Sequence, residues 1–436
     1  MLGSKQWAYI SGATSTFQLH VVPLGGIYPS ICLLSGCAAA GSVRYVRELM
    51  RYPWFWFTCI LFVLQALSLL WSPSHRIGAR TLIYQIPFIT LSLAMVHVAR
   101  HNPIAAERII KVTVAGTVIQ ALAVILFRIL PQYKHAYLNS VFADLFESAN
   151  RLAVFGGEDQ SNVVDPSKSA GFTTYPNPAS AWLGLAGMSA WYLSRLYKSR
   201  FLTYVAVLDC VAVFFTGSKA GILAACAVIT LMTALDIALQ VARTRKLEIH
   251  HAIIACFGVA AIGVATPFFV EGAAKFLGDS SFTLSSRQEL WAFAKDEFRV
   301  HPIEGLGFGG WERKVPIQGR VTQMPPHNAF IILWSQSGIL AVLIGAGFAS
   351  TFLWWAFDRI RSGVYSERMV AKGLFAGYLW LFIQAQGENF GLFGEDHMKP
   401  ILALMAGLLA GLRYQALNDP EQPRNDEVIA PKIALG

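Results

Sequence analysis

Three short polar segments in the second half of the sequence carry residues that could bind and react with a phosphate group. They hold, in chain order, Lys219, Arg287, and the neighbours His327 and Asn328. A cation held at a membrane boundary is costly to desolvate and well placed to form charge-assisted hydrogen bonds with phosphate oxygens. An imidazole titrates near neutral pH and can therefore accept a proton from an attacking hydroxyl group. These residue types predict an anion-binding site with a general base beside it.

Each of these residues also has a simpler interpretation. Lys219 could be a snorkelling lysine that fixes the ends of two spans, and His327 could be a helix cap or an interface residue. Arg287 is more informative, because the spacing of Ser286 and Glu289 predicts a capping box that opens a helix. A cation in the first turn opposes the helix dipole. Its presence there favours an anionic partner.

The composition places these residues in a membrane protein. Hydrophobic residues make up 55% of the 436 residues, charged residues 14%, and the mean hydropathy is +0.47, which excludes a soluble globular protein. The apolar blocks are about 17 to 25 residues long, the length at which a helix crosses a hydrocarbon layer of ~30 Å. We therefore predict an all-α fold, a polytopic transmembrane helical bundle of about eleven spans (10–12) near 17–40, 53–71, 81–99, 107–130, 176–194, 201–215, 220–241, 251–270, 327–356, 370–387 and 399–412.

Basic residues predict the orientation of the bundle. They cluster in alternate short connections, and the positive-inside rule assigns those connections to the cytoplasm. The net charge of +9 is then explained by topology and by contacts with anionic membrane lipids, and not by nucleic-acid binding. The clusters are Arg44, Arg47 and Arg51; Arg100, Arg108 and Lys111; Arg195, Lys198 and Arg200; Arg243, Arg245 and Lys246; and Arg359, Arg361, Arg368 and Lys372.

Two long connections lie on the opposite side and are large enough to build a site there. Their periodicity predicts amphipathic helices over 286–300 and, more weakly, over 138–152. The first apolar block lacks a clear cleavage site, so we expect a span and not a signal peptide. The predicted division is N-terminal spans (1–130), an outer loop (131–175), central spans (176–270), a large outer loop with site residues (271–326), C-terminal spans (327–414) and a cytoplasmic tail (415–436).

The sequence gives no indication of a metal centre. All six cysteines lie inside apolar blocks without a CxxC spacing, so we interpret them as packing residues. No DxD-like pair stands beside the polar segments. The glycine-rich stretch 305–310 allows sharp turns or a close approach of backbone to a ligand, but it lacks a nucleotide-binding spacing.

Taken together, the motifs resemble those of the O-antigen ligase and polymerase superfamily of bacterial envelope enzymes. The resemblance rests on the break TGSKAG, the helix SRQELW, the turn PIEGLGFGG and the pair HN at the start of a span, over about 160 residues from Tyr175 to Gly338. It implies a metal-independent glycosyltransferase of the bacterial inner membrane that needs no cofactor. The implied donor is a glycan on undecaprenyl diphosphate, used at the periplasmic face.

The resemblance also implies roles for individual residues. Arg287 and His327 match the family in type, as catalytic residues, with Arg287 and Lys219 binding the diphosphate. Lys219 departs from the pattern, since ligases commonly have arginine there; lysine keeps the charge but loses the bidentate geometry. We expect supporting roles for Asn328, Ser218, Trp291, Tyr175, Asn177 and Glu388, and rank Asn389, Glu395, Asp396 and His397 behind them.

Several functions remain open from the sequence. A polymerase of O-antigen or exopolysaccharide, with the growing glycan as acceptor, is favoured over a ligase that uses lipid A core. A protein O-oligosaccharyltransferase is a third choice of acceptor. A transporter or flippase would show ionisable residues in the middle of several spans, whereas most polar residues here stand at the outer boundary. A purely structural scaffold would leave Arg287 unexplained.

Overall fold

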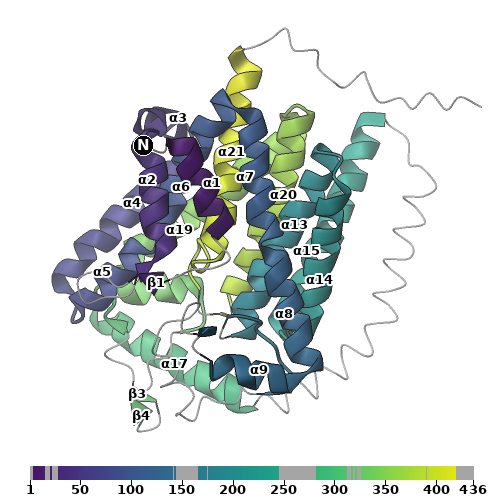
Figure 1. The fold of residues 1–436 in the computed structure, drawn as a ribbon. Coiled ribbons are helices and arrows are strands. Elements are labelled where there is room, and N and C mark those ends of the chain that lie inside the picture. Colours follow the sequence, from purple (N-terminus) through teal and green to yellow (C-terminus); the bar gives the residue numbers. More distant parts are fainter. Residues whose placement is uncertain are drawn as a thin grey trace, which may run out of the picture.

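The computed structural model is a bundle of α-helices with two very short strand pairs (Figure 1). It describes residues 3–14, 20–21, 28–140, 142–143, 165–173, 175–244, 281–311, 316–317, 320–321, 326–388 and 390–418. The strand pairs are β1 (His20–Val21) with β2 (Tyr28–Pro29), and β3 (Pro316–Ile317) with β4 (Arg320–Val321). The predicted all-α fold is confirmed.

Five helical segments within the described residues are long and apolar enough to cross a membrane. They are Pro53–Trp71, made of α4 (Pro53–Ser68) and η2 (Leu69–Trp71); His75–His101, containing α5 (His75–Ile83) and α6 (Ile86–His101); Pro103–Ile129, containing α7 (Pro103–Ala115) and α8 (Thr117–Ile129); Lys219–Ala242 within α15 (Lys219–Thr244); and α19 (Ala329–Ser362). The chain is thus a polytopic membrane protein. The total of about eleven spans stays a prediction, and the predicted span 251–270 lies outside the described residues.

The first predicted span, 17–40, was wrong. This region holds the antiparallel strands β1 and β2 and one helix, α2 (Ser30–Ala40), while a separate helix, α1 (Ser4–Thr14), precedes it. Each helix has 11 residues, which at ~1.5 Å per residue covers about half of a ~30 Å hydrocarbon layer. The chain therefore reverses direction between α1 and α2 and does not cross the membrane in one continuous helix. The two helices pack against each other.

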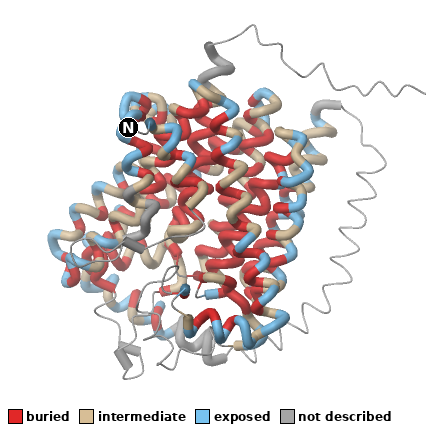
Figure 2. The backbone as a smooth tube through the Cα atoms, in the orientation of Figure 1, coloured by how far each residue is buried: buried red, intermediate tan, exposed pale blue. Residues whose placement is uncertain are grey.

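The other helices of the bundle are α13 (Pro176–Leu196), α14 (Arg200–Phe215), α20 (Tyr365–Ala385) and α21 (Met398–Asn418). α13 packs against both α14 and α20, α21 packs against α6, and α19 packs against α4. Buried residues run through the middle of the bundle (Figure 2). An aromatic cluster joins three of the helices, with ring centroids 5.3 Å apart for Trp54 and Phe352 and 6.0 Å apart for Phe88 and Phe348.

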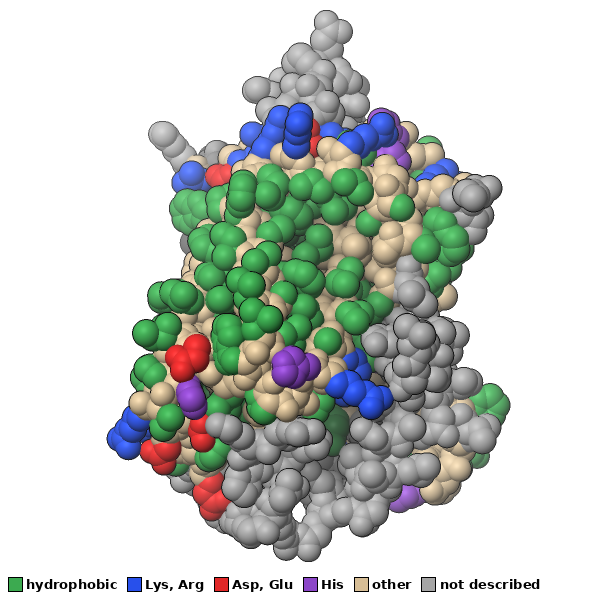
Figure 3. All heavy atoms as spheres, turned by 90° about the vertical axis from the view of Figure 1, so that its left-hand side faces the viewer, with side chains coloured by type: hydrophobic (Ala, Val, Ile, Leu, Met, Phe, Trp, Pro, Cys, Tyr) green, Lys and Arg blue, Asp and Glu red, His purple; other side chains and the backbone are tan. Residues whose placement is uncertain are grey.

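Lysine and arginine side chains gather at one end of the bundle (Figure 3). We call it the basic end; it is where α6, α13 and α19 end and where α7, α14 and α20 begin. The opposite end, called the loop end, holds α9 (Pro131–Leu138) and α17 (Ser281–Val300). The positive-inside rule predicts that the basic end faces the cytoplasm.

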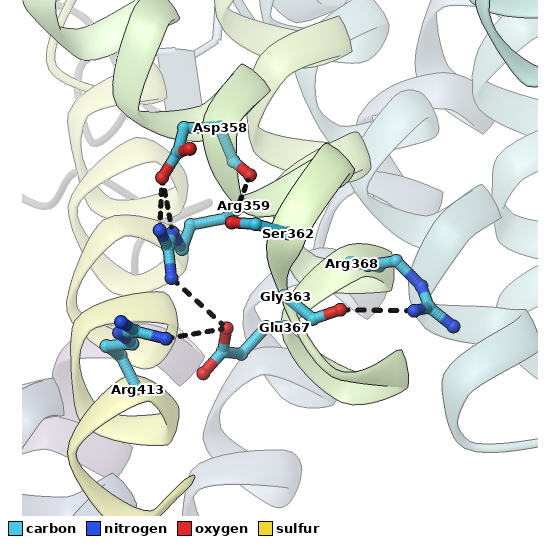
Figure 4. Close-up of polar contacts among 7 residues, drawn as sticks. All are labelled: Asp358, Arg359, Ser362, Gly363, Glu367, Arg368 and Arg413. Atoms are coloured by element: carbon cyan, nitrogen blue, oxygen red, sulfur yellow. Dashed lines mark hydrogen bonds and ion pairs between the residues drawn. The ribbon is translucent and has the colours of Figure 1, made fainter. Parts of the chain in front are cut away.

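Buried ion pairs join the helices at the basic end (Figure 4). Glu367, in the first turn of α20, is fully buried. Its Oε2 lies 3.8 Å from Nη1 of Arg359 on α19 and 4.0 Å from Nη1 of Arg413 on α21. Arg359 also binds its neighbour Asp358. The short helix α3 (Val46–Leu49) is tied to α6 in the same way, by Glu48 and Arg100 at 3.0 Å. The basic end is therefore held by charges that the protein itself neutralises.

The amphipathic helix predicted over 286–300 is present as α17 but begins earlier, at Ser281. Of the predicted apolar stripe, Leu290 and Ala294 are buried, whereas Trp291 and Phe298 are 41% and 37% exposed. The predicted capping box at Ser286 was wrong, because that residue lies inside the helix. Arg287 consequently stands well beyond the first turn, and the argument from the helix dipole does not apply to it. Most of the weaker helix predicted over 138–152 lies outside the described residues; α9 ends at Leu138.

Candidate functional site

Hydrogen bonds between distant segments bring several helix ends together at the loop end. The Asn328 side chain donates from Nδ2 to the Gln386 carbonyl at 3.1 Å, which joins the start of α19 to the end of α20. Asn177, at the start of α13, donates from Nδ2 to Glu388 Oε1 at 2.8 Å. Glu388 is nearly buried, with 5% of its surface exposed. The predicted supporting residues Asn177, Asn328 and Glu388 thus lie around the end of α20.

The start of α15 is built from the predicted break TGSKAG. Ser218 is buried and its Oγ accepts from Gly221 N at 3.0 Å, which caps the helix. Gln384 of α20 lies at the same turn. When its side-chain amide is oriented so that both the oxygen and the nitrogen form hydrogen bonds, Oε1 accepts from Gly221 N at 3.1 Å. A Cβ added at Gly221 would lie 2.6 Å from Ser180 Oγ of α13, so glycine is needed for this approach. Lys219 is the first residue of α15 and is exposed.

The start of α19 carries the predicted pair His327 and Asn328. Asn328 is the N-cap, and its Oδ1 accepts from Phe330 N at 2.9 Å and from Ile331 N at 3.1 Å. Trp291 Nε1 of α17 donates to the Pro326 carbonyl at 2.8 Å, directly before His327. Position 287 is one helical turn before Trp291 and on the same face of α17. The Arg287 side chain lies outside the described part of the structure.

His327 has a strained backbone. Its φ is +51°, in the left-handed region that side chains other than glycine rarely adopt. Such a conformation costs about 1–2 kcal/mol per residue, and it persists only where the surroundings fix it. The cap at Asn328 and the bond from Trp291 to Pro326 fix both neighbours. These contacts hold His327 in this conformation, and a catalytic role for its side chain stays a prediction.

The segment 165–173 covers the break at α15 and was not identified from the sequence. Ser169 N donates to the Thr216 carbonyl at 3.1 Å, and a Cβ added at Gly217 would lie 2.5 Å from the Ser167 carbonyl oxygen. Gln120 of α8 holds the segment through its whole amide, since Nε2 donates to the Ala170 carbonyl at 2.7 Å and Oε1 accepts from Phe172 N at 3.0 Å. Buried amides and close approaches of this kind depend on tertiary contacts, so periodicity gives no signal for them.

Lys134 of α9 is a buried cation in the same region, with 5% of its surface exposed. Its Nζ donates to the carbonyls of Asp165 at 3.2 Å and Lys168 at 3.1 Å. Burial lowers the pKa of Lys134 to about 8; the Asp165 carboxylate opposes this shift, and Arg128 and Lys168 add to it. The segment 165–173 is therefore held by a lysine that is only about half protonated near pH 8.

The glycine-rich stretch 301–311 packs backbone against backbone. Gly338 interrupts α19 with φ +79°, and a Cβ there would lie 1.6 Å from the Ile303 carbonyl oxygen. Leu306 N donates to the Ser335 carbonyl at 2.7 Å. Gly307 and Gly309, both with positive φ, approach the backbone of Ser72 and Gly78. These glycines therefore fit the loop into the kink of α19 and the turn before α5, a packing role that requires no ligand.

The remaining predicted residues lie on nearby helix starts. Tyr175 is the N-cap residue of α13 and is 39% exposed. His397 stacks on Trp182 of α13 with ring centroids 4.7 Å apart, and Lys399 Nζ binds Asp396 Oδ1 at 2.8 Å. Asn389 lies outside the described residues. That Lys219, Arg287 and His327 share one outward-opening pocket stays a prediction.

Comparison with known protein families identifies the class of this central region. Residues 204–346 match the family model described as O-antigen ligase. The match includes Lys219, Arg287, Trp291, His327 and Asn328. It confirms the predicted resemblance to the O-antigen ligase and polymerase superfamily, so residues 204–346 of this membrane protein are similar to an O-antigen ligase. Comparison with curated proteins gave no match.

Proposed function

We propose that this protein is an inner-membrane glycosyltransferase that polymerises a glycan carried on undecaprenyl diphosphate, at the periplasmic face. The observation that carries the proposal is the meeting of the starts of α13, α15 and α19 with the end of α20 at the loop end, opposite the basic end. The starts of α15 and α19 lie inside the region that the O-antigen ligase family model matches, and α13 and α20 pack against helices of that region. The positive-inside rule puts this end outside the cytoplasm.

The proposed reaction is a displacement at the anomeric carbon of the donor sugar. The acceptor oxygen forms a bond to this carbon while the bond from the carbon to the phosphate oxygen breaks. The hydroxyl proton passes to the imidazole of His327, and the negative charge remains on the departing undecaprenyl diphosphate. Lys219 and Arg287 stabilise that charge, a role that preorganised cations perform well in a site that excludes water. The two cations make a metal ion unnecessary in this proposal.

The acceptor distinguishes the two leading versions of the function. A polymerase adds the donor glycan to a second lipid-linked glycan. We favour this version because the lysine in the break and the sequence HNAF resemble exopolysaccharide polymerases more closely than ligases. A ligase that transfers the glycan to lipid A core is the second candidate, favoured by the description of the matching family model.

Reconstitution tests the proposal and separates the two versions. The purified protein is placed in liposomes with a defined undecaprenyl-diphosphate-linked repeat unit, with and without lipid A core, in the presence of EDTA. Ladders of longer glycan without lipid A core are expected, and transfer only to the core would identify a ligase instead. No transfer under either condition, with the folded protein in the membrane, would contradict the proposal; dependence on added Mg²⁺ or Mn²⁺ would contradict its metal-free form.

A transporter is the rival of another class. It would use ionisable residues in the middle of its spans, and Asp209 of α14 is such a residue, fully buried with Oδ2 accepting from Thr117 Oγ1 at 2.7 Å. Its bond to a neighbouring hydroxyl fits a packing contact between α14 and α8. Asp236 of α15, the other carboxylate in or near a span, forms an ion pair with Lys372 of α20, which likewise fits helix packing. Movement of intact lipid-linked repeat unit across the liposome membrane, without elongation, would favour the transporter.

A further inference from the structure

We propose that the cleft between α1 and α7 at the basic end binds an anionic phospholipid of the adjacent membrane leaflet. The cleft has a volume of about 590 Å³, within the range of about 300–1,000 Å³ typical of small-molecule sites. Its lining includes Lys5, Gln6 and Tyr9 from α1, and Asn102, Ile104 and Arg108 from α7 and its cap. It lies at the end of the bundle opposite the candidate glycosyltransferase site.

The shape of the cleft follows from one close contact. A Cβ added at Gly12 of α1 would lie 2.3 Å from Thr113 Oγ1 of α7 and 3.4 Å from the Ile109 carbonyl oxygen, so the two helices touch there. The lining residues come from the first two turns of both helices, nearer the basic end. The helices therefore meet at one end and leave a space between their first turns, where the leaflet's headgroups lie.

The polar part of the cleft is cationic. Lys5 and Arg108 are both exposed, and the neighbouring acid, Glu107, forms an ion pair with Lys111. Asn102 Oδ1 accepts from Ala105 N at 2.9 Å as the cap of α7, and the positive end of that helix dipole adds to the field of the two cations. Two cations at a helix start suit a phosphate group, which each can bind by charge-assisted hydrogen bonds.

The apolar part of the cleft argues for a lipid and against a soluble anion. Ile104 and Tyr9 line it and are exposed, by 63% and 42% respectively. In a membrane these side chains would contact acyl chains, while the cations reach the headgroup layer. Basic pockets between transmembrane helices on the cytoplasmic side commonly bind anionic headgroups. The arrangement fits an amphiphile with a phosphate head, such as phosphatidylglycerol.

Native mass spectrometry of the full-length protein with defined lipids tests this site. The protein is equilibrated with phosphatidylglycerol or with phosphatidylethanolamine and then activated until loosely bound lipid is lost. The double variant Lys5→Gln/Arg108→Gln removes both cations, and the matched control Lys198→Gln/Arg361→Gln removes one exposed lysine and one exposed arginine elsewhere at the basic end. Thermal unfolding of all proteins checks that the variants remain folded.

We expect the wild type and the control to retain phosphatidylglycerol, and the cleft variant to retain at least about tenfold less, since a hydrogen bond to a charged group contributes about 1.5–3 kcal/mol. Equal retention by the cleft variant and the control would overturn the proposal. Equal retention of phosphatidylethanolamine and phosphatidylglycerol would also overturn it, because the cations would not select the headgroup. Binding of phosphatidylglycerol only after removal of residues 419–436 would overturn it as well, because that acidic segment would then be the occupant of the cleft.

Discussion

The two ends of the bundle are held together by different kinds of interaction. At the basic end, carboxylates and arginines form ion pairs between helices, as Glu367 does with Arg359 and Arg413. At the loop end, side-chain amides join the helix ends, as Asn328 does with the Gln386 carbonyl and Asn177 with the Glu388 carboxylate. Ion pairs at the loop end include Lys168 with Asp165, which stand three residues apart in one loop.

This difference predicts that the basic end contributes mainly to stability and the loop end mainly to glycan transfer. Removing one partner of a buried ion pair leaves the other charge uncompensated, so the basic end should contribute strongly to stability. The neutral hydrogen bonds of the loop end contribute less, about 0.5–1.5 kcal/mol each, and a bond such as that from Asn328 to the Gln386 carbonyl positions a helix start without neutralising a cation. Changes at the loop end should therefore affect transfer of glycan more than unfolding.

The largest expected effect is on activity and comes from His327→Asn. Asparagine tolerates the left-handed backbone at this position, so the variant should unfold at the wild-type temperature or slightly above. Transfer should fall by about 10²–10⁴-fold, because the general base is lost. Reconstituted glycan transfer and thermal unfolding measure both quantities. His135→Asn, at an exposed position of α9, is the control that should change neither. Wild-type transfer by His327→Asn would remove the proposed base.

The next effect is on stability and comes from Glu367→Gln at the basic end. The substitution deprives Arg359 and Arg413 of their shared carboxylate, while Arg359 keeps Asp358, so it should lower the free energy of unfolding by roughly 1–3 kcal/mol. Transfer per folded molecule should stay unchanged. Glu304→Gln makes the same change at an exposed loop-end residue and should leave the free energy of unfolding nearly unchanged. Equal stability losses in the two variants, measured by thermal unfolding in detergent, would erase the contrast between the ends.

A smaller, pH-dependent effect should come from Lys134. The folded protein lowers the pKa of Lys134 from 10.5 to about 8. Between these values the unfolded chain binds more protons, so stability should rise with pH across this window. Lys134→Met should lose that rise while Lys295→Met, at an exposed position of α17, keeps it. The measurement is the difference between unfolding temperatures at pH 8 and pH 10. The same rise in Lys134→Met would show that another group causes it.

The sequence predicted the long apolar helices well and their irregular ends poorly. The predicted span 201–215 nearly coincides with α14, and the predicted span 220–241 lies within α15. Hydropathy could not show that the block 17–40 holds a chain reversal, although Pro23, Gly25 and Gly26 break it. The start of α17 was misplaced because Ser281, Thr283, Ser285 and Ser286 are all suitable caps.

Tertiary contacts decided what the sequence could not show at the site. The motifs did predict Lys219 at the start of α15 and Asn328 at the start of α19. Gly305 packs against the kink at Gly338, and Gly307 and Gly309 pack against Ser72 and Gly78; these contacts join segments distant in the chain, so local pattern favoured a ligand-binding role equally well. The fastening of segment 165–173 by Gln120 and Lys134 depends on burial that has no periodic signal.

Binding of undecaprenyl diphosphate to the purified protein tests the central claim most directly. If Lys219 and Arg287 hold the diphosphate at the loop end, Lys219→Gln and Arg287→Gln should each weaken binding by about tenfold or more. Arg361→Gln, which removes an exposed cation from the basic end, should bind as the wild type does. Unchanged affinity in both loop-end variants, with binding weakened by Arg361→Gln, would contradict the account and place the lipid-linked donor at the opposite end of the bundle.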